Sequence, residues 1–355
     1  MTFHVKSIAA TSPHTPLVPH DLERRTVLPD DVVLDILYCG ICHSDVHLAN
    51  NDWQSTHYPL VPGHEIVGKV SEVGKSVNKF KVGDVGAVGC IVDSCSECSM
   101  CKSDLEMFCQ KGMTLSLNSD EGERFPGHFT GGGFSQKIVV RESMVLHVPE
   151  KLQDPKLLPG VAPILCSGIT SYSPLRQFDV KKGSKVAILG MGGLGNIGVR
   201  LARALGADVT VVSRSHSKDD AAKASGASHI VASSSKEEMD QAASQFDLIL
   251  DTIPSDHDLN SYIPLLKPFG TICIVGQLGP LSTPLNTVPA IFGNRRIAFS
   301  AIGGIKETQE LLDLCAEKGI TADHEVIKTT EVNDVWKKIS DGTTSQRFVI
   351  DTNTF

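Results

Sequence analysis

Residues 183–215 read "GSKVAILGMGGLGNIGVRLARALGADVTVVSRS", and this stretch decides the fold of much of the chain. A short apolar run from Val186 to Leu189 predicts a buried strand, and a second run from Val209 to Val212 predicts another. Between them, an amphipathic segment that ends near Leu205 predicts a helix. The order strand, glycine turn, helix, strand is typical of a parallel α/β sheet.

The turn in this unit carries the pattern G-x-G-x-x-G, with its three glycines at 190, 192 and 195. Glycine permits the tight turn and lets the backbone approach a pyrophosphate, which then lies at the positive end of the helix. Within a strand-turn-helix unit of about thirty residues, the pattern predicts a dinucleotide site, although a turn that serves packing alone is the alternative. The expected contacts are Gly190, Met191, Gly192, Gly193, Leu194 and Gly195.

The residues after the second strand indicate which dinucleotide binds. A site for NAD usually places an acidic residue there to accept a hydrogen bond from the ribose 2'-hydroxyl, whereas a 2'-phosphate needs hydroxyls and cations. This chain has Ser213, Arg214, Ser215 and Lys218 at that point, and no acid at the strand end. We therefore predict NADP(H), with a solvated polar turn as the alternative.

Three more strands are predicted at 228–232, 246–251 and 270–276, separated by stretches of helical length. They extend the α/β pattern into a doubly wound parallel sheet of the Rossmann type, spanning about residues 157–295. Residues 1–156 contain short β-rich runs broken by Gly and Pro, which predict a strand-rich partial barrel. Residues 296–355 contain a predicted helix and a terminal strand, "QRFVIDT", that could return to the first domain.

Four cysteines lie in "CSECSMCKSDLEMFC", at Cys95, Cys98, Cys101 and Cys109. Four thiolates on one short segment suit a tetrahedral structural zinc. Free surface cysteines are one alternative. An iron–sulfur cluster is another, but the bacterial ferredoxin spacing has three residues before its last cysteine and a proline after it, whereas here the gap is seven and Gln110 follows.

Composition narrows the function classes. The 355 residues carry a formal charge of -8, which does not favour nucleic-acid binding. No run of eighteen apolar residues and no signal-like N-terminus is present, so we expect a cytoplasmic protein. Ten cysteines in a chain of this length indicate metal binding or chemistry more than disulfides.

Several motifs together resemble one family. They are "CGICHSDVH", "YPLVPGHEIVGKV", the four-cysteine segment, "APILCSGITSYSPL", "GMGGLG" and "IGGIKETQELLDLC", spread over nearly the whole chain. The sequence resembles zinc-dependent medium-chain dehydrogenases/reductases, in particular the cinnamyl alcohol dehydrogenase-like branch of NADP-dependent alcohol dehydrogenases and aldehyde reductases. The resemblance implies a GroES-like catalytic domain in front of the Rossmann domain.

The resemblance also implies a second, catalytic zinc, with Cys42, His64 and Cys166 as its ligands. In such a site three protein ligands leave a fourth position for a carbonyl oxygen. By the same resemblance Glu65 lies at the metal as a transient ligand that can replace water, and Asp45 accepts a hydrogen bond from the far nitrogen of His64. Ser44 passes the proton on through cofactor hydroxyls, and His47 exchanges it with solvent.

Other roles follow from the resemblance alone. The implied cofactor contacts are His43, Ser44, Thr170, Thr252, Gly276, Ser300, Ala301 and Ile302, and Arg347 either touches phosphate or is a solvated strand end. The implied substrate pocket contains Trp53, Leu115, Ala301 and Ile302, and its aliphatic character at Leu115 and Ala301 favours a broad range of aldehydes over dedicated lignin precursors.

The resemblance also implies a homodimer, formed through the edge strand of the nucleotide domain near "RRIAFS" (295–300). The segment 118–133, "NSDEGERFPGHFTGGG", departs from the family pattern and has no interpretation at this level. Two alternative functions are a zinc-independent quinone or enone reductase of the same fold and a zinc-storing or redox-sensing protein without catalysis. The complete set of Cys42, His64 and Cys166 argues against the first, and the glycine turn argues against the second.

Overall fold

The computed structural model describes residues 1–276, 279–342, 344 and 346–355. The chain divides into two compact units, one made of Met1–Cys166 and Gly303–Phe355 and the other of Ser167–Ile302. The N-terminal part of the first unit ends at residue 166 and the second unit at 302, ten and seven residues after the boundaries at 156 and 295 that the sequence suggested. Among the described residues, none of the helices has the length and apolar character that crossing a bilayer requires.

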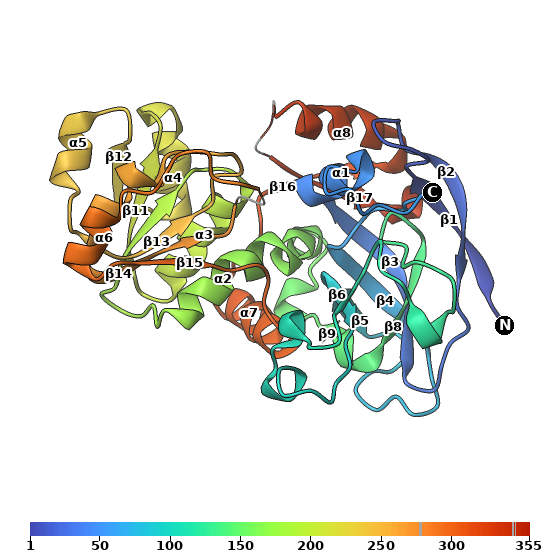
Figure 1. Cartoon of the computed structure of the whole chain (residues 1–355). Helices are drawn as coiled ribbons and strands as arrows, with labels where there is room; N and C mark the ends of the chain where they lie inside the picture. Colours follow the sequence, from blue (N-terminus) through green and yellow to red (C-terminus); the bar gives the residue numbers. More distant parts are fainter. Residues whose placement is uncertain (277–278, 343, 345) are drawn as a thin grey trace. The chain divides into compact units, whose positions relative to one another are not determined.

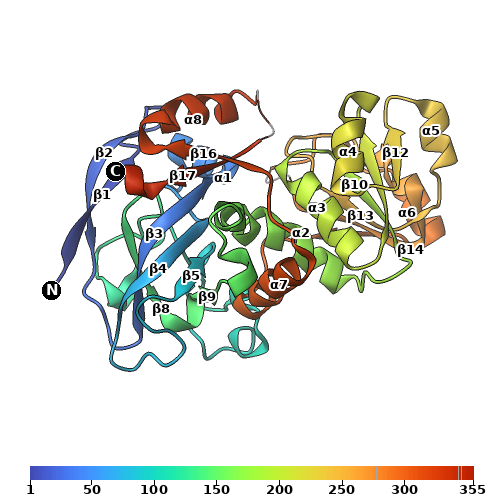
Figure 2. The same ribbon diagram turned by 180° about the vertical axis from the view of Figure 1, so that it is seen from behind.

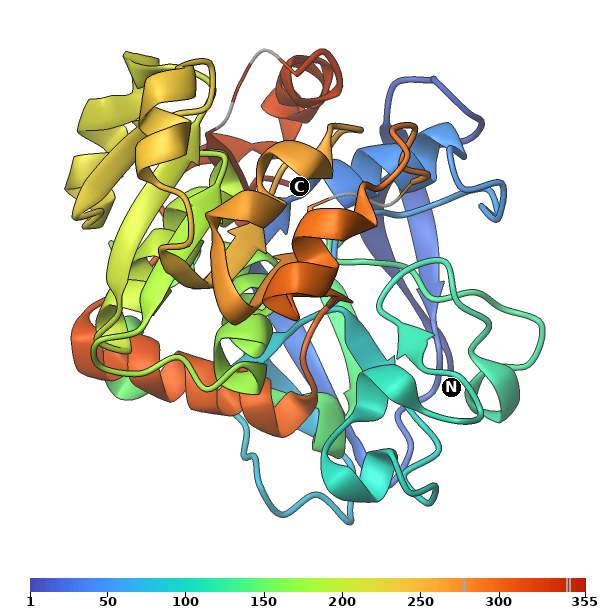
Figure 3. The ribbon, with the colours of Figure 1, turned by 60° about the vertical axis from the view of Figure 1, so that its left-hand side comes forward.

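The second unit is built on a parallel six-stranded sheet with the strand order β12-β11-β10-β13-β14-β15 (Figures 1 and 3). The strands are β10 (Lys185–Leu189), β11 (Asp208–Ser213), β12 (His229–Ala232), β13 (Phe246–Asp251), β14 (Leu266–Ile274) and β15 (Arg296–Phe299). The helices are α2 (Ser167–Gln177), α3 (Gly193–Ala204), α4 (Asp219–Ser225), α5 (Lys236–Gln241) and α6 (Thr287–Gly293). The prediction of a doubly wound parallel sheet is confirmed.

Strand β10 lies at the centre of this sheet because both of its faces are apolar. Val186, Ala187, Ile188 and Leu189 are fully buried, as expected for a strand covered by helices on both sides. β10 pairs in parallel with β11 on one side and with β13 on the other. In α3, Ile197, Val199 and Leu201 are buried, so the apolar stripe of the helix faces the core.

The first unit is mainly antiparallel (Figure 2). Its main sheet has the order β16-β17-β3-β4-β5-β9, with β8 also paired to β3, and two separate two-stranded sheets join β1 to β2 and β6 to β7. The strands are β1 (Phe3–Ala9), β2 (Val18–Arg24), β3 (Asp31–Ile41), β4 (Ile66–Val73), β5 (Val85–Val88), β6 (Ile91–Asp93), β7 (Thr114–Leu115), β8 (Lys137–Arg141), β9 (Leu146–His147), β16 (His324–Lys328) and β17 (Arg347–Asp351). The strand-rich character predicted for the N-terminal part is confirmed.

The helices of the first unit are α1 (His43–Asn50), α7 (Ile305–Lys318) and α8 (Val332–Ser340), together with 3-10 turns such as η3 (Gly122–Arg124) and η6 (Leu158–Leu165). The C-terminal strand β17 pairs antiparallel with β3, opposing Ile350 to Cys39. β3 also pairs antiparallel with β4, opposing Cys39 to Ile66. The end of β3 and the start of β4 therefore meet at one edge of the sheet, where α1 begins.

Candidate metal centres and nucleotide site

The four cysteines of the 95–109 segment gather around one point. Their sulfur atoms all lie within 4.8 Å of one another, and the Sγ atoms of Cys95 and Cys101 are 3.9 Å apart. Backbone N–H groups donate to three of the sulfurs: Cys98 N to Cys95 (3.4 Å), Cys101 N to Cys98 (3.5 Å) and Cys95 N to Cys109 (3.5 Å). Hydrogen bonds from the N–H groups of Cys101 and Gln110 lower the pKa of Cys98 to about 6. Clustered sulfurs that receive N–H donors suit thiolates around a cation, so the residues fit a structural zinc.

A second group collects Cys42, His64, Glu65 and Cys166, whose ligand atoms also lie within 4.8 Å of one another. Cys42 stands at the start of α1, His64 and Glu65 precede β4, and Cys166 ends η6. The Sγ atom of Cys166 is 3.9 Å from Cys42 Sγ and 3.3 Å from His64 Nε2. A hydrogen bond from the Cys166 thiol holds the pKa of Cys42 well below its usual range. Two sulfurs and one imidazole thus converge in a buried place.

Asp45 fixes the geometry of this group. Its buried carboxylate accepts hydrogen bonds from the Nδ1–H of His64 (3.0 Å), the backbone N–H of Gly63 (2.9 Å) and the backbone N–H of Cys42 (2.9 Å). Because Nδ1 carries the proton, the lone pair of Nε2 faces the sulfurs. This is the tautomer that a metal-binding histidine needs.

The surroundings of the Glu65 carboxylate indicate whether this group of residues suits a cation. The residue is fully buried, and neither carboxylate oxygen has a hydrogen-bond partner among the described residues. Burial raises its pKa to about 8, and Arg347 Nη1 lies 3.8 Å from Oε1. A buried carboxylate without a hydrogen bond, next to two sulfurs and an imidazole, fits a site that binds a divalent metal.

Arg347 itself is 12% exposed at its side chain. It is therefore not the solvated strand end that was one of its two interpretations.

Ser44, His43 and His47 follow Cys42 on α1. Ser44 Oγ lies 3.7 Å from Cys42 Sγ, and the rings of His43 and His47 stack with centroids 4.7 Å apart. The Nδ1–H of His47 donates to Asp52 at 2.6 Å. Asp52 was missed by sequence reasoning, although an acid shortly after His47 and directly before Trp53 was a usable signal.

Cys90 was also missed. Its thiol shares a hydrogen bond with Cys166, and this bond lowers the pKa of Cys90. The residue follows "VGAVG" as a single cysteine, and neither its spacing nor its neighbours in the sequence distinguish it. Only the fold brings it next to Cys166.

In the second unit, the glycine turn has the geometry that the pattern requires. Gly190 has φ +88°, which favours glycine, and a Cβ on Gly195 would lie 2.1 Å from the carbonyl oxygen of Gly190. A Cβ on Gly192 would meet nothing within 4 Å, so the space in front of α3 is open. The Thr252 hydroxyl donates to the carbonyl oxygen of Leu189 at 2.6 Å and lies under the turn. Gly276 packs tightly against Thr252, because a Cβ there would lie 2.4 Å from its carbonyl carbon.

The polar segment after β11 lies next to this turn. Lys218 Nζ donates to the carbonyl oxygen of Met191 at 3.2 Å, and the Ser215 hydroxyl donates to Ser217 Oγ at 3.1 Å. Arg214 is exposed, and its guanidinium has no partner among the described residues. Ser213 ends β11. Of these cations and hydroxyls, Lys218 is the one that contacts the glycine turn directly in the part of the chain that the structure describes.

The remaining predicted residues lie in both units. Thr170 is buried in α2, and Ser300, Ala301 and Ile302 follow β15 in the second unit. Trp53 and Leu115 lie in the first unit. The ring of Trp53 is 5.5 Å from that of His47, and Leu115 N donates to Ser119 Oγ at 3.0 Å.

Two features together define the zinc-containing class of medium-chain oxidoreductases. One is the dinucleotide-type α/β unit, and the other is a strand-rich unit that carries both a group of two cysteines with one histidine and a group of four cysteines. Comparison with known proteins agrees. Residues 28–150 match the alcohol dehydrogenase GroES-like domain, and residues 193–317 match the zinc-binding dehydrogenase family.

Individual relatives cover the whole chain. Aldehyde reductase YahK of Escherichia coli is 45% identical over 99% of both chains, and NADP-dependent alcohol dehydrogenase C 1 of Mycolicibacterium smegmatis is 45% identical over 98% of both. A cinnamyl alcohol dehydrogenase from Sorghum bicolor superposes with a TM-score of 0.92 at 38% identity, covering 99% of this chain and 98% of that one. The cinnamyl alcohol dehydrogenase of Helicobacter pylori, solved with NADP(H), gives 0.90 at 39% identity over 99% of both. The chain belongs to the zinc-binding alcohol dehydrogenase family.

Proposed function

We propose that this chain is an NADP-dependent alcohol dehydrogenase that acts as an aldehyde reductase on a broad range of aromatic and aliphatic aldehydes. The observation that carries the proposal is the convergence of Cys42, His64 and Cys166 beside the buried carboxylate of Glu65, which has no hydrogen-bond partner among the described residues. These three residues would hold the catalytic zinc, and Cys95, Cys98, Cys101 and Cys109 would hold the structural zinc. When bound, the catalytic zinc supplies a Lewis acid for the aldehyde oxygen, and NADPH supplies the hydride.

The residues of α1 supply the proton that the new alkoxide needs. The Ser44 hydroxyl, next to Cys42, can donate to the substrate oxygen and accept a proton in turn. His47 is partly exposed and exchanges protons with solvent, and Asp52 keeps the proton on its Nδ1. Asp45 acts earlier, because it orients His64 before substrate binds.

The preference for NADPH is supported by the segment after β11. Arg214 is exposed with an unpaired guanidinium, Ser213 and Ser215 offer hydroxyls, and Lys218 lies against the glycine turn. A guanidinium on a phosphate is worth about 1.5–3 kcal/mol, or about 10- to 100-fold in affinity. Arg214→Ala should therefore raise the KM for NADPH by that factor and leave the KM for NADH unchanged. Equal use of NADH and NADPH by the wild type would contradict the preference.

One assay tests the activity itself. NADPH consumption with benzaldehyde is followed by its absorbance for the wild type, for Cys42→Ala and for the wild type after treatment with a strong zinc chelator. We expect oxidation of NADPH only in the untreated wild type. Activity that survives both treatments would point to the zinc-independent reductase instead.

We further propose a homodimer formed through strand β15. This strand ends the six-stranded sheet, so one of its edges has no partner among the described residues. Phe299 is 71% exposed on β15, and Phe292 is 89% exposed on the neighbouring α6. Sedimentation of the wild type as a dimer, and of Phe299→Asp as a monomer, is the expected result.

A cytoplasmic location is part of the same proposal. All ten cysteines are unpaired, which suits a reducing compartment. Fractionation of the source cells, with the protein followed by antibody, tests it.

A further inference from the structure

The 118–133 loop, which the sequence pattern left without interpretation, folds back on itself. Asn118 N donates to the carbonyl oxygen of Thr130 (2.9 Å), and Thr130 N donates to that of Ser119 (2.7 Å). Asp120 and Phe129 form an antiparallel bridge one step further out. The loop is therefore an ordered hairpin-like element, and its two ends lie side by side.

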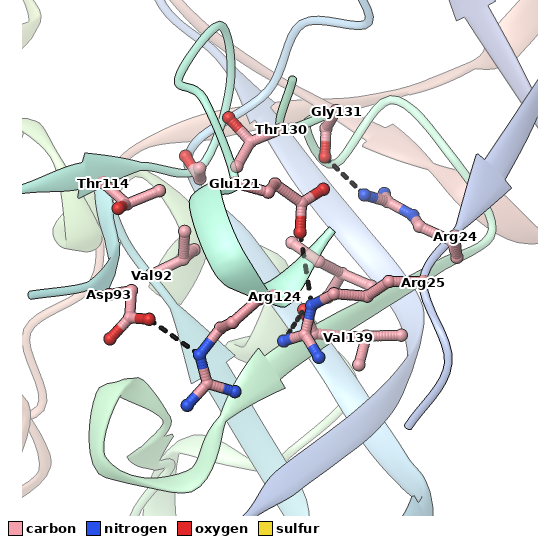
Figure 4. A pocket seen from close by; sticks show the side chains of 12 residues that line it. Arg24, Arg25, Val92, Asp93, Thr114, Glu121, Arg124, Thr130, Gly131 and Val139 are labelled. Atoms are coloured by element: carbon pink, nitrogen blue, oxygen red, sulfur yellow. Dashed lines mark hydrogen bonds and ion pairs between the residues drawn. The ribbon is translucent and has the colours of Figure 1, made fainter. Parts of the chain in front are cut away.

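An arginine cluster anchors the outer part of this loop (Figure 4). Arg124, in the 3-10 turn at its tip, donates to three carboxylates, those of Asp30 (2.8 Å), Asp31 (3.0 Å) and Asp93 (2.8 Å). Glu121 pairs with Arg25 at 3.2 Å, and Arg25 also pairs with Asp31. Each of these guanidinium groups already has carboxylate partners, so the cluster fixes the loop and offers no site for an external anion.

The C-terminal end of the loop lies along the segment that leads into His64. Arg24 donates to the carbonyl oxygens of Gly131 (2.6 Å) and Gly132 (3.0 Å). Gly132 N then donates to the carbonyl oxygen of Val61, and Gly133 N donates to that of Gly63. A Cβ on Gly132 would lie 2.3 Å from the carbonyl oxygen of Pro62, so only glycine allows this approach.

The N-terminal end of the loop supports a second segment, residues 55–57. Asn118 Oδ1 accepts from His57 N at 2.8 Å, and Asn118 Nδ2 donates to the carbonyl oxygen of Ser55 at 3.0 Å. The ring of Phe129 stacks on that of His57 with centroids 3.7 Å apart. These residues closely follow Trp53, whose ring lies 5.5 Å from His47.

We propose that the 118–133 loop determines substrate specificity, with Asn118 as the positioning residue that holds Trp53 in place and the arginine cluster as its anchor. The proposal rests on the function given above and on the place in the substrate pocket that the family resemblance implies for Trp53. An aromatic aldehyde gains contact area and ring packing from a fixed indole, whereas a small aliphatic aldehyde gains little. The loop therefore favours aromatic aldehydes.

The kinetic test compares Asn118→Ala with the matched control Asn78→Ala. Asn78 is exposed where Asn118 is half-buried, and its Nδ2 likewise donates to a serine carbonyl oxygen, that of Ser76, at 2.8 Å. Asn118→Ala should lower kcat/KM for benzaldehyde by about 10-fold, as expected for the loss of about two hydrogen bonds. For acetaldehyde the loss should be below about 2-fold, and the KM for NADPH should not change. Asn118→Asp keeps the acceptor for His57 N, so its kcat/KM for benzaldehyde should lie between those of Asn118→Ala and the wild type.

A second readout does not depend on activity. The chain has two tryptophans, and Trp336 is buried, so acrylamide quenching of the accessible fluorescence reports Trp53. Quenching should increase in Asn118→Ala and not in Asn78→Ala. Unchanged quenching, an unchanged benzaldehyde-to-acetaldehyde ratio, or an equal loss for both aldehydes with a lower Tm would each overturn the proposal. If the wild type reduces neither aldehyde, the proposed function is wrong, and quenching still decides whether Asn118 holds Trp53.

Discussion

The two cysteine-containing clusters of the first unit are built in opposite ways. The Cys95–Cys109 cluster comes from one segment of fifteen residues, and its N–H donors to sulfur come from that segment and from Gln110 directly after it. The Cys42–His64–Cys166 cluster draws on three segments far apart in the chain, brought together by the ends of β3, β4 and η6. Local spacing is sufficient for the first cluster, whereas the second depends on the whole unit being folded.

The clusters also differ in what surrounds them. The first is made of sulfur alone, and two of its cysteines are only partly buried. The second is buried, mixes sulfur with an imidazole, and contains in Glu65 a carboxylate without a hydrogen bond. An all-sulfur group closes the coordination of zinc and stabilises the fold, and a mixed group with three ligands suits chemistry.

The largest expected effect is on the second cluster. Cys42→Ala should lower kcat by at least about 10³-fold, because the Lewis acid is lost with its ligand, and the zinc content should fall from two ions per chain to one. The Tm should change little compared with that of the next variant. Stopped-flow kinetics and mass spectrometry measure both quantities. An active Cys42→Ala enzyme with two zinc ions would remove the distinction between the clusters.

The next effect concerns the first cluster. Cys101→Ser should also leave one zinc ion per chain, but it should lower the Tm by at least about 10 °C, since a structural metal contributes its binding free energy to folding. The folded fraction should keep kcat within about 3-fold of the wild type. Calorimetry together with active-site titration gives both numbers. If Cys101→Ser lost activity while keeping its Tm, the roles of the clusters would be exchanged.

A smaller loss of kcat is expected for changes at residues next to the second cluster. Ser44→Ala should lower kcat by about 10²-fold, the usual worth of a positioned acid, without loss of zinc. Asp52→Asn should lower kcat by less than Ser44→Ala does, because Asp52 acts only through His47. Ser76→Ala removes a serine hydroxyl that has no role in the proton route, and it is the control. Wild-type turnover in Ser44→Ala would exclude the proton route.

The smallest expected effect is a pH dependence of the folding stability, and it comes from ion pairs next to the first cluster. Asp93, two positions before Cys95, binds Arg124 and Arg141, and Asp30 shares both arginines. The hydrogen bond from Arg124 lowers the pKa of Asp30 from its ordinary 3.8. A lowered carboxyl pKa stabilises the fold at pH values above about 4, and this contribution is lost as the pH falls through the lowered pKa.

Asp30→Asn should therefore lower the stability at pH 7 by less than about 1 kcal/mol, because the Asp30 side chain is 40% exposed and screened by solvent. The difference from wild type should shrink toward pH 3. Urea denaturation at both pH values measures it, with Asp247→Asn, an exposed partner of Lys267, as the control. A difference that grows in acid would contradict the assignment.

Much of the fold was predictable because its signals are local. The apolar runs that became β10 and β11 are buried on both faces. Gly190 has a positive φ and Gly195 leaves no room for a side chain, so pattern and structure agree. The Cys95–Cys109 group was predictable from spacing for the same reason. The ligands Cys42, His64 and Cys166 were expected only through resemblance, since no spacing rule connects positions so far apart.

The remaining features are tertiary and leave no periodic trace. Asp52, Cys90 and Arg124 each look like an ordinary polar residue in a loop or turn. The partners of Cys90 and Arg124 are set by how separate strands and turns meet: Cys90 meets Cys166, and Arg124 meets three carboxylates. Asp52 is different, because its partner His47 lies only five residues before it. Sequence patterns report which face of an element is buried, and they do not report such pairings.

The run of glycines at 131–133 has a consequence for reading natural variation in this chain. A Cβ at Gly133 would lie 2.5 Å from the Ile66 side chain and 2.7 Å from the Cys39 sulfur, and one at Gly132 would press on Pro62. Alanine at either position leaves every ligand, the nucleotide turn and the proton route intact in the sequence. Because all motif residues are unchanged, such an allele would be classified as harmless from its sequence motifs. It would nevertheless displace the backbone that carries His64.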